Sequence, residues 1–187
     1  LGPFDMAVVM NVVGEEAGGG VALPVDFELA AASYDFVGFE GADSAIEATP
    51  DMMGNPSATV MRSTKTVGAQ FYAGTALNLD TPIDFSASEM ISIKSWSPKN
   101  DIPVRVRLEN VDNSVGVELD VNTTVASGWE TLTYDFTGLT AGTDFVRVVV
   151  FFEFIAGLAG DGSTYYYDDI AIFTPPADND TCGTAFT

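Results

Sequence analysis

From Leu23 onward the chain is a succession of short segments rich in valine, isoleucine, phenylalanine, tyrosine and threonine, and clusters of glycine, proline, asparagine, aspartate and serine divide them. No segment repeats its apolar residues at the spacing of an α-helix over three turns. Because β-branched and aromatic runs between turn signals are typical of strands, about ten such runs without interleaved helices predict an antiparallel β-sandwich or barrel. The fold class that we expect is therefore all-β.

The same segments predict where the folded domain begins and ends. Residues 1–21 contain a run of three glycines and are expected to be a tail or linker from an upstream segment. Residues 22–174 are the expected β domain. Two consecutive prolines stop its last strand, so residues 175–187 are expected to be a linker and the start of a following module. The expected strands are 23–29, 34–40, 58–63, 69–73, 89–96, 102–110, 115–121, 129–136, 144–155 and 164–173.

The charge balance excludes several classes of function. The chain has 27 acidic and 7 basic residues, a formal net charge of −20, and no histidine. A nucleic-acid partner is excluded because phosphate binding needs a basic surface, and an anionic membrane surface is disfavoured. Without histidine, Ser-His-Asp and Cys-His triads are excluded. The single cysteine, Cys182, allows no internal disulfide, and no apolar run reaches the roughly 18 residues that membrane insertion as a helix requires.

Strand alternation gathers most of the basic residues in one place. Four expected strands alternate clearly enough to assign side chains to faces: 89–96, 102–110, 115–121 and 144–155. If these strands share one sheet, its outward face carries Trp96, Phe151 and four of the seven basic residues: Lys94, Arg105, Arg107 and Arg147. Cross-strand ion pairs on a solvated face would explain this pattern. A binding face for a neutral polyhydroxylated ligand is the alternative, which the pattern alone favours less.

Six stretches occur in an order that is typical of one family: VDFE at 25–28, GAQFYAGT at 68–75, IDFS at 83–86, SWSPK at 95–99, WETLTYDF at 129–136 and GDGSTYYYDDI at 160–170. In these stretches the chain resembles the carbohydrate-binding-module-like β-sandwich domains of secreted multidomain proteins from marine Bacteroidetes. The resemblance implies a two-sheet antiparallel jelly-roll β-sandwich, an extracellular or cell-surface location and covalently linked neighbouring domains. It also implies that Cys182 belongs to the following module.

The resemblance further implies a structural calcium ion that holds the first strand against the last. Glu28, Asp168 and Asp169 match the pattern of the family's calcium site, and Asp26 is an additional candidate. Carboxylates suit this role because calcium prefers six to eight oxygen ligands. Alternatively, Asp168 and Asp169 only end a strand at the rim of the sandwich.

For the ligand, the resemblance implies a polysaccharide, with marine β-glucans such as laminarin as the expected class. Aromatic rings stack on the apolar faces of sugars, and charged side chains bind the hydroxyl groups. Tyr72 stands where related sequences tend to carry tryptophan, and Trp96 is the second aromatic candidate. The full set of expected ligand-binding residues is Gln70, Phe71, Tyr72, Lys94, Trp96, Arg105, Arg107 and Glu109.

Three classes of function follow from these observations. The leading hypothesis is a non-catalytic polysaccharide-binding module whose parent protein carries any glycoside hydrolase elsewhere. The alternative is a structural or adhesive module of a surface protein without glycan binding. An enzyme is disfavoured, because Glu109 and Glu118 are the obvious carboxylate pair and neighbouring arginines would keep both ionised.

Overall fold

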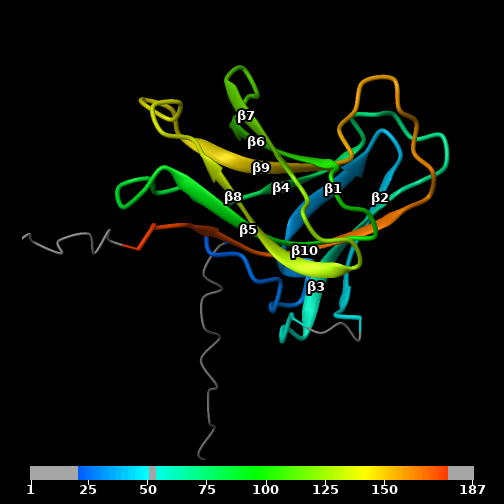
Figure 1. The fold of residues 1–187 in the computed structure, drawn as a ribbon. Coiled ribbons are helices and arrows are strands. Elements are labelled where there is room, and N and C mark those ends of the chain that lie inside the picture. Colours follow the sequence, from blue (N-terminus) through cyan, green and yellow to red (C-terminus); the bar gives the residue numbers. More distant parts are fainter. Residues whose placement is uncertain (1–20, 51–53, 177–187) are drawn as a thin grey trace, which may run out of the picture.

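The structure is a computed structural model that describes residues 21–50 and 54–176. It consists of two five-stranded antiparallel sheets packed face to face (Figure 1). One sheet has the order β1 (Asp35–Phe39), β4 (Gly74–Asn78), β9 (Phe145–Phe152), β6 (Pro103–Asn110) and β7 (Gly116–Asn122). The other has the order β2 (Ala42–Ala48), β3 (Thr59–Lys65), β10 (Thr164–Ile172), β5 (Met90–Ser97) and β8 (Gly128–Asp135).

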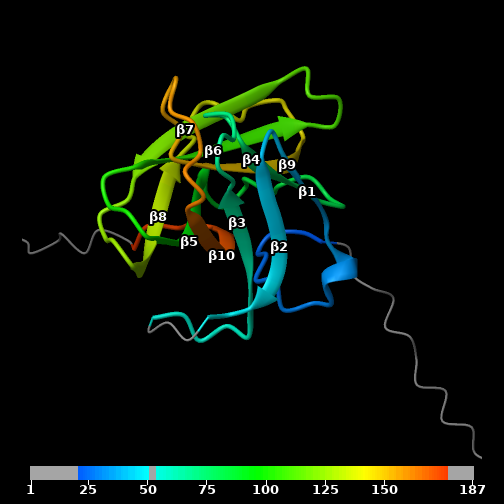
Figure 2. The same ribbon diagram turned by 90° about the vertical axis from the view of Figure 1, so that its right-hand side faces the viewer.

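The chain passes repeatedly from one sheet to the other, so most consecutive strands lie in opposite sheets. Only β2 with β3 and β6 with β7 are consecutive strands that pair within one sheet of the described residues. The expected all-β jelly-roll sandwich is confirmed. Figure 2 shows the two layers from the side of β2. The only helical element in the described residues is one turn of 3₁₀-helix, η1 (Ala31–Ser33). The described part of the chain contains no helix long and apolar enough to cross a membrane.

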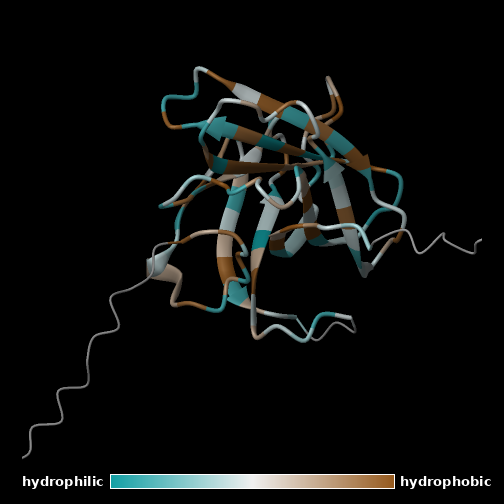
Figure 3. Ribbon diagram, turned by 90° about the vertical axis from the view of Figure 1, so that its left-hand side faces the viewer, coloured by the Kyte–Doolittle hydropathy of each residue, from teal (hydrophilic) through white to brown (hydrophobic). Residues whose placement is uncertain are grey.

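Strand alternation builds the core between the sheets. In β6, Val104, Val106 and Leu108 are fully buried, and the intervening arginines point outward. The alternation appears as brown and teal bands along the strands in Figure 3. Burial of each such side chain contributes roughly 1.5–3 kcal/mol, so the sheet faces are fixed by these residues. The outward set therefore forms the surfaces on which a ligand can bind.

Two expected strands are wrong and two strands were not expected. Segment 23–29 contributes only an isolated bridge between Val25 and Ile170, and segment 69–73 is a turn that leads into β4. The missed strands, β2 and β4, have few large apolar residues. β2 is a half-exposed edge strand, and Gly74 of β4 makes room for the Phe151 ring, which lies 2.7 Å from where a Cβ atom would be.

The condition under which four basic residues would share one face, that all four alternating strands lie in one sheet, is not met. β6, β7 and β9 lie in one sheet, but β5 lies in the other, between β10 and β8. Alternation shows which residues of a strand share a face, and it does not show which sheet the strand joins. Lys94 and Trp96 therefore lie on the opposite side of the sandwich from Arg105, Arg107 and Arg147.

The predicted flanking segments lie largely outside the described residues. These are the tail over 1–21, of which only Val21 is described, and the segment over 175–187, of which 175 and 176 are described. Cys182 falls outside the described residues as well. The domain boundaries therefore stay predictions.

Candidate functional site

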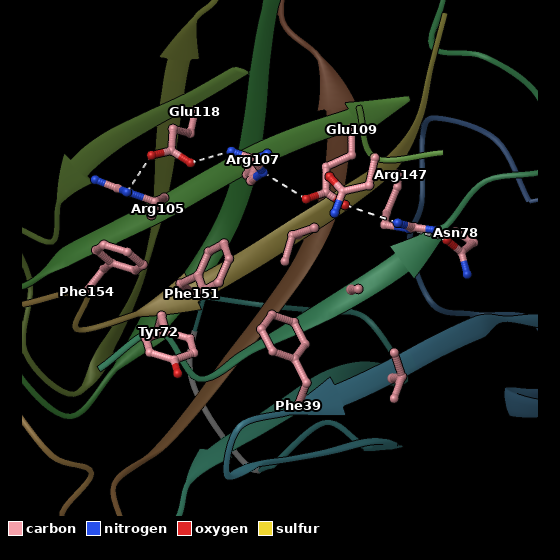
Figure 4. Close-up of a pocket in the computed structure, with 14 residues that line it drawn as sticks. Phe39, Tyr72, Asn78, Arg105, Arg107, Glu109, Glu118, Arg147, Phe151 and Phe154 are labelled. Carbon is pink, nitrogen blue, oxygen red and sulfur yellow. Dashed lines mark hydrogen bonds and ion pairs between the residues drawn. The ribbon is translucent and has the colours of Figure 1, made fainter. Parts of the chain in front are cut away.

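A groove of about 660 Å³ crosses the outward face of the sheet formed by β1, β4, β9, β6 and β7 (Figure 4). All five strands contribute residues to it, and Tyr72 and Phe154 contribute from loops. The groove has two unlike sides. Figure 4 shows a row of charged side chains along one side and aromatic rings along the other.

The charged row is a chain of ion pairs across β6, β7 and β9. Arg105 donates two hydrogen bonds to Asp120, at 2.7 and 2.8 Å, and one to Glu118 at 2.6 Å. Arg107 donates hydrogen bonds to Glu118 at 2.9 Å and to Glu109 at 2.7 Å, so it links these two carboxylates. Each arginine thus contacts two carboxylates, and Arg107 with Glu118 is a cross-strand ion pair of the kind that the sequence pattern suggested.

Arg147 continues the row on β9. Its guanidinium donates to Glu109 at 3.1 Å and to Asn78 of β4 at 2.6 Å. The Glu109 side chain is only 9% exposed and sits between Arg107 and Arg147. Opposite Glu109, Gly116 leaves space for Arg107, because a Cβ atom at this position would overlap the Arg107 guanidinium. Hydrogen bonds on both sides of Glu109 and the space beside Gly116 thus fix the orientation of the Arg107 and Arg147 side chains.

This arrangement fixes donors and acceptors before any ligand arrives. Hydrogen bonds from Arg105 to Asp120 and from Arg107 to Glu109 raise the pKa of both guanidinium groups, although partial burial opposes the effect. Both arginines therefore remain charged at every physiological pH. Their side chains are 20% and 28% exposed, so N–H groups that the carboxylates leave free can donate to a ligand.

The aromatic side of the groove is a connected cluster. Phe151 contacts Phe39 at 5.7 Å and Phe154 at 5.3 Å between ring centroids, in edge-to-face geometry. Phe154 also contacts Phe71, which in turn contacts Tyr72 at 5.0 Å. Edge-to-face pairs of this kind are favourable beyond their buried area. The exposed ring at the end of this cluster is Tyr72, at 38%.

The Arg105 guanidinium connects the two sides, because it lies 3.8 Å from the centre of the Phe154 ring. If the alternation that puts Phe151 on the outward face continued through the expected strand 144–155, Phe154 would lie on the core side. The structure differs because β9 ends at Phe152, and Glu153 adopts a left-handed backbone conformation with φ 51°. This bend reverses the alternation and turns Phe154 into the groove.

The structure brings four of the eight expected ligand-binding residues into the groove: Tyr72, Arg105, Arg107 and Glu109. Gln70 and Phe71 line a separate small pocket of about 160 Å³ between two loops. The Phe71 ring also packs edge-to-face against Tyr72. Lys94 and Trp96 lie on the outward face of the other sheet. There Trp96 packs against Tyr166 at 5.6 Å and pairs across the strands with Trp129.

Sequence reasoning missed several groove residues. Asn78 lies on β4, which was not expected as a strand, and Phe39 lies on β1, an expected strand whose side chains were not assigned to faces. Phe154 was missed for the reason given above. Phe151 and Arg147 had been assigned to the outward face, and the structure confirms that assignment.

The four expected calcium ligands do not meet at one point. The described residues contain no group of three or more acidic, histidine or cysteine side chains that could hold a metal ion. Glu28 accepts hydrogen bonds from the amides of Ala58 and Thr59, and Asp26 accepts one from the Glu28 amide. Asp169 has φ 47° at a bulge in β10 and forms an ion pair with Lys94 at 3.1 Å.

Asp168 differs from the other three because its carboxylate is completely buried. It accepts hydrogen bonds from the Asn55 amide at 2.8 Å and from the Asp169 backbone, and it makes no ion pair within the described residues. Burial raises the pKa of the Asp168 carboxyl above its usual range, although the hydrogen bonds oppose this. Burial likewise raises the pKa of Tyr34, and the charges of Asp26, Glu28 and Asp168 add to the effect. Asp26, Glu28 and Asp168 therefore lie in one region around Tyr34. This region offers several carboxylate oxygens, and Asp168 makes no ion pair there within the described residues.

Comparisons with known proteins support the fold. No family model matches the sequence, and no curated protein matches it. Among solved structures, a family 11 carbohydrate-binding module from Clostridium thermocellum, in complex with a β-1,3-1,4-mixed-linked tetrasaccharide, is similar to it with a TM-score of 0.52 and 18% identity. The match covers 83% of this chain and 98% of that module.

Two further structures are similar. One is a structure that explains the promiscuous specificity of carbohydrate-binding modules from the β-sandwich superfamily, and it has a TM-score of 0.53 and 12% identity. The match covers 84% of this chain and 64% of that chain. The other is an arabinose-bound α-L-arabinofuranosidase, with a TM-score of 0.58, 14% identity and coverage of 82% of this chain. This chain spans only 26% of the length of that enzyme. At these identities the comparisons establish a shared β-sandwich fold.

Proposed function

We propose that this chain is a non-catalytic carbohydrate-binding module and that the groove on the β1-β4-β9-β6-β7 sheet is its binding site. The observation that carries the proposal is the pairing of an aromatic side with a row of fixed charged groups in one open groove. The fold shared with a module in complex with a tetrasaccharide supports it. Carbohydrates require both features, because pyranose rings have apolar faces and hydroxyl edges.

The groove favours a neutral ligand over an anionic one. Its row contains three arginines and the three carboxylates of Glu109, Glu118 and Asp120, so its charges balance. An anionic polymer would have to displace carboxylates that are already bonded to the arginines. It would also be repelled by the chain as a whole, which has a formal net charge of −20. Hydroxyl groups can bond to the remaining N–H groups and lone pairs without displacement. Within neutral glycans, we propose β-glucans such as laminarin as the ligand class.

Catalysis is a weaker interpretation of the same groove. Glu109 and Glu118 each accept hydrogen bonds from two arginines on both carboxylate oxygens, so neither has an oxygen without a protein partner to present to a substrate. Some structural neighbours are parts of enzymes, such as the arabinofuranosidase. We therefore propose that any hydrolase activity resides in another domain of a secreted or cell-surface parent, as in the proteins of marine Bacteroidetes that the sequence resembles. A structural or adhesive role remains the alternative to be tested.

We also propose a structural calcium ion beside Asp168. The support is a fully buried carboxylate that makes no ion pair in the described part of the chain. Its hydrogen-bond partner Asn55 donates through its amide nitrogen at 2.8 Å, and the Asn55 amide oxygen accepts a hydrogen bond from Lys94 at 3.3 Å. A buried charge without a counter-charge is costly, and a bound cation would remove that cost. Asp168 would hold the ion, with Glu28 at the same end of the sandwich. Asn55 would have to turn its amide group to bring its oxygen to the ion, because that oxygen accepts a hydrogen bond from Lys94.

Affinity electrophoresis against a panel of polysaccharides tests the proposed function. We expect laminarin or mixed-linkage β-glucan to retard the chain, and anionic alginate to leave its migration unchanged. Binding of a neutral glycan should also persist at high salt, because it does not depend on charge neutralisation. If no polysaccharide retards the chain, the binding proposal is wrong and the structural or adhesive role becomes the better interpretation.

A further inference from the structure

Lys65 is a buried cation that no part of the proposed binding site yet explains. It is the last residue of β3 and is only 3% exposed. Its ammonium group donates three hydrogen bonds, to the backbone oxygens of Phe71 at 3.1 Å, Phe152 at 3.3 Å and Glu153 at 2.8 Å. All three of its N–H donors are therefore used on main-chain carbonyl groups.

These three carbonyl groups belong to the two segments that supply the groove with loop-borne aromatic rings. Phe71 directly precedes Tyr72, and Glu153 directly precedes Phe154. The segments are distant in sequence, yet the rings of Phe71 and Phe154 contact each other at 5.3 Å. One ammonium group on β3, a strand of the opposite sheet, thus bonds to both segments behind the groove.

The contact also stabilises a strained residue. Glu153 has φ 51°, a conformation that costs about 1 kcal/mol or more for a residue other than glycine. Lys65 binds its carbonyl oxygen, while Lys99 at 2.7 Å and Tyr165 at 3.2 Å bind its buried carboxylate. The bend at Glu153, which turns Phe154 into the groove, is therefore stabilised by Lys65 at the Glu153 main chain and by Lys99 and Tyr165 at its side chain.

We propose that Lys65 is a positioning residue for the groove: its ammonium group holds the 71–72 and 152–154 segments together so that Tyr72 and Phe154 line the aromatic side of the groove together. It does not touch the groove itself. This inference rests on the proposed function, since it assigns the residue a role in glycan binding. It makes the shape of a site on one sheet depend on a strand of the other.

Replacing Lys65 with methionine tests the proposal, because methionine has a similar length and no donors. We expect glycan affinity to fall about tenfold and amide hydrogen exchange to become faster in peptides covering 69–74 and 152–158. Lys65→Gln, which retains donors at a shorter reach, should show smaller changes in both and provides a second variant if methionine prevents folding. Both measurements use protein that circular dichroism shows to be folded.

Ile91→Ala is the matched control, because Ile91 is fully buried in β5 and contacts neither segment through a hydrogen bond in the described structure. It should lower the melting temperature without changing glycan affinity or exchange in the two segments. The proposal is overturned if Ile91→Ala weakens binding as much as Lys65→Met, or if both Lys65 variants loosen the segments and keep wild-type affinity. If the unmodified chain binds no glycan, the proposed function fails, and exchange in the ligand-free protein still decides whether Lys65 holds the segments.

Discussion

Replacing Tyr72 with alanine is expected to weaken glycan binding about thirtyfold, whereas the same replacement of Trp96 should leave binding unchanged. Tyr72 is the exposed ring at the end of the aromatic cluster, and Phe71 fixes it from behind. A rigid aromatic anchor of this kind typically contributes about 2 kcal/mol to binding, which corresponds to the thirtyfold loss. Isothermal titration calorimetry with a soluble β-glucan oligosaccharide measures it.

Trp96→Ala is the decisive comparison, because both aromatic residues were selected from the sequence and the structure places them on opposite faces. Tyr72→Phe serves as a second control, since it keeps the ring and removes only the hydroxyl group. We expect Tyr72→Phe to retain most of the affinity. A strong loss with Trp96→Ala and none with Tyr72→Ala would move the site to the β5-β10 face and contradict the groove assignment.

The sequence was sufficient to predict the composition of the charged row, but not the sheet in which each residue lies. Alternation assigned Arg105, Arg107 and Arg147 to outward faces, and the structure confirms these assignments. The same logic placed Lys94 beside them, and it failed because sheet membership depends on which strands pair. Pairing between strands that are distant in the chain leaves no trace in a local pattern. The charged side of the groove was therefore largely predictable, apart from Asn78.

The aromatic side was less predictable, because it depends on irregular backbone. Phe154 enters the groove through the left-handed bend at Glu153, and neither residue has a sequence signal for such a bend. Glu153 is not glycine or asparagine, the residues that usually mark this conformation. The bend persists because Lys65, Lys99 and Tyr165 all bind Glu153, and these partners come from distant segments. Such a site is stabilised by tertiary contacts rather than by local preference.

Calcium is expected to raise the melting temperature of the chain by about 5–10 °C, and Asp168→Asn should abolish this response. A ligand that binds only the native state stabilises it by about 2.7 kcal/mol when its concentration is a hundred times its dissociation constant. For a domain of this size each kcal/mol raises the melting temperature by about 2–4 °C. Differential scanning calorimetry in calcium and in excess chelator measures the difference.

The variant also separates an ion site from a purely structural carboxylate. Without calcium, Asp168→Asn removes a buried charge that makes no ion pair in the described residues, so it should cost little stability or increase it. With calcium, the wild-type chain should become the more stable of the two, and the order of stability reverses. Asp161→Asn is the matched control, because Asp161 is bonded to Lys99 and should leave the calcium response intact. If the wild-type melting temperature is the same in calcium and in chelator, Asp168 is a buried acid held by Asn55 and the Asp169 backbone amide, and the calcium proposal is wrong.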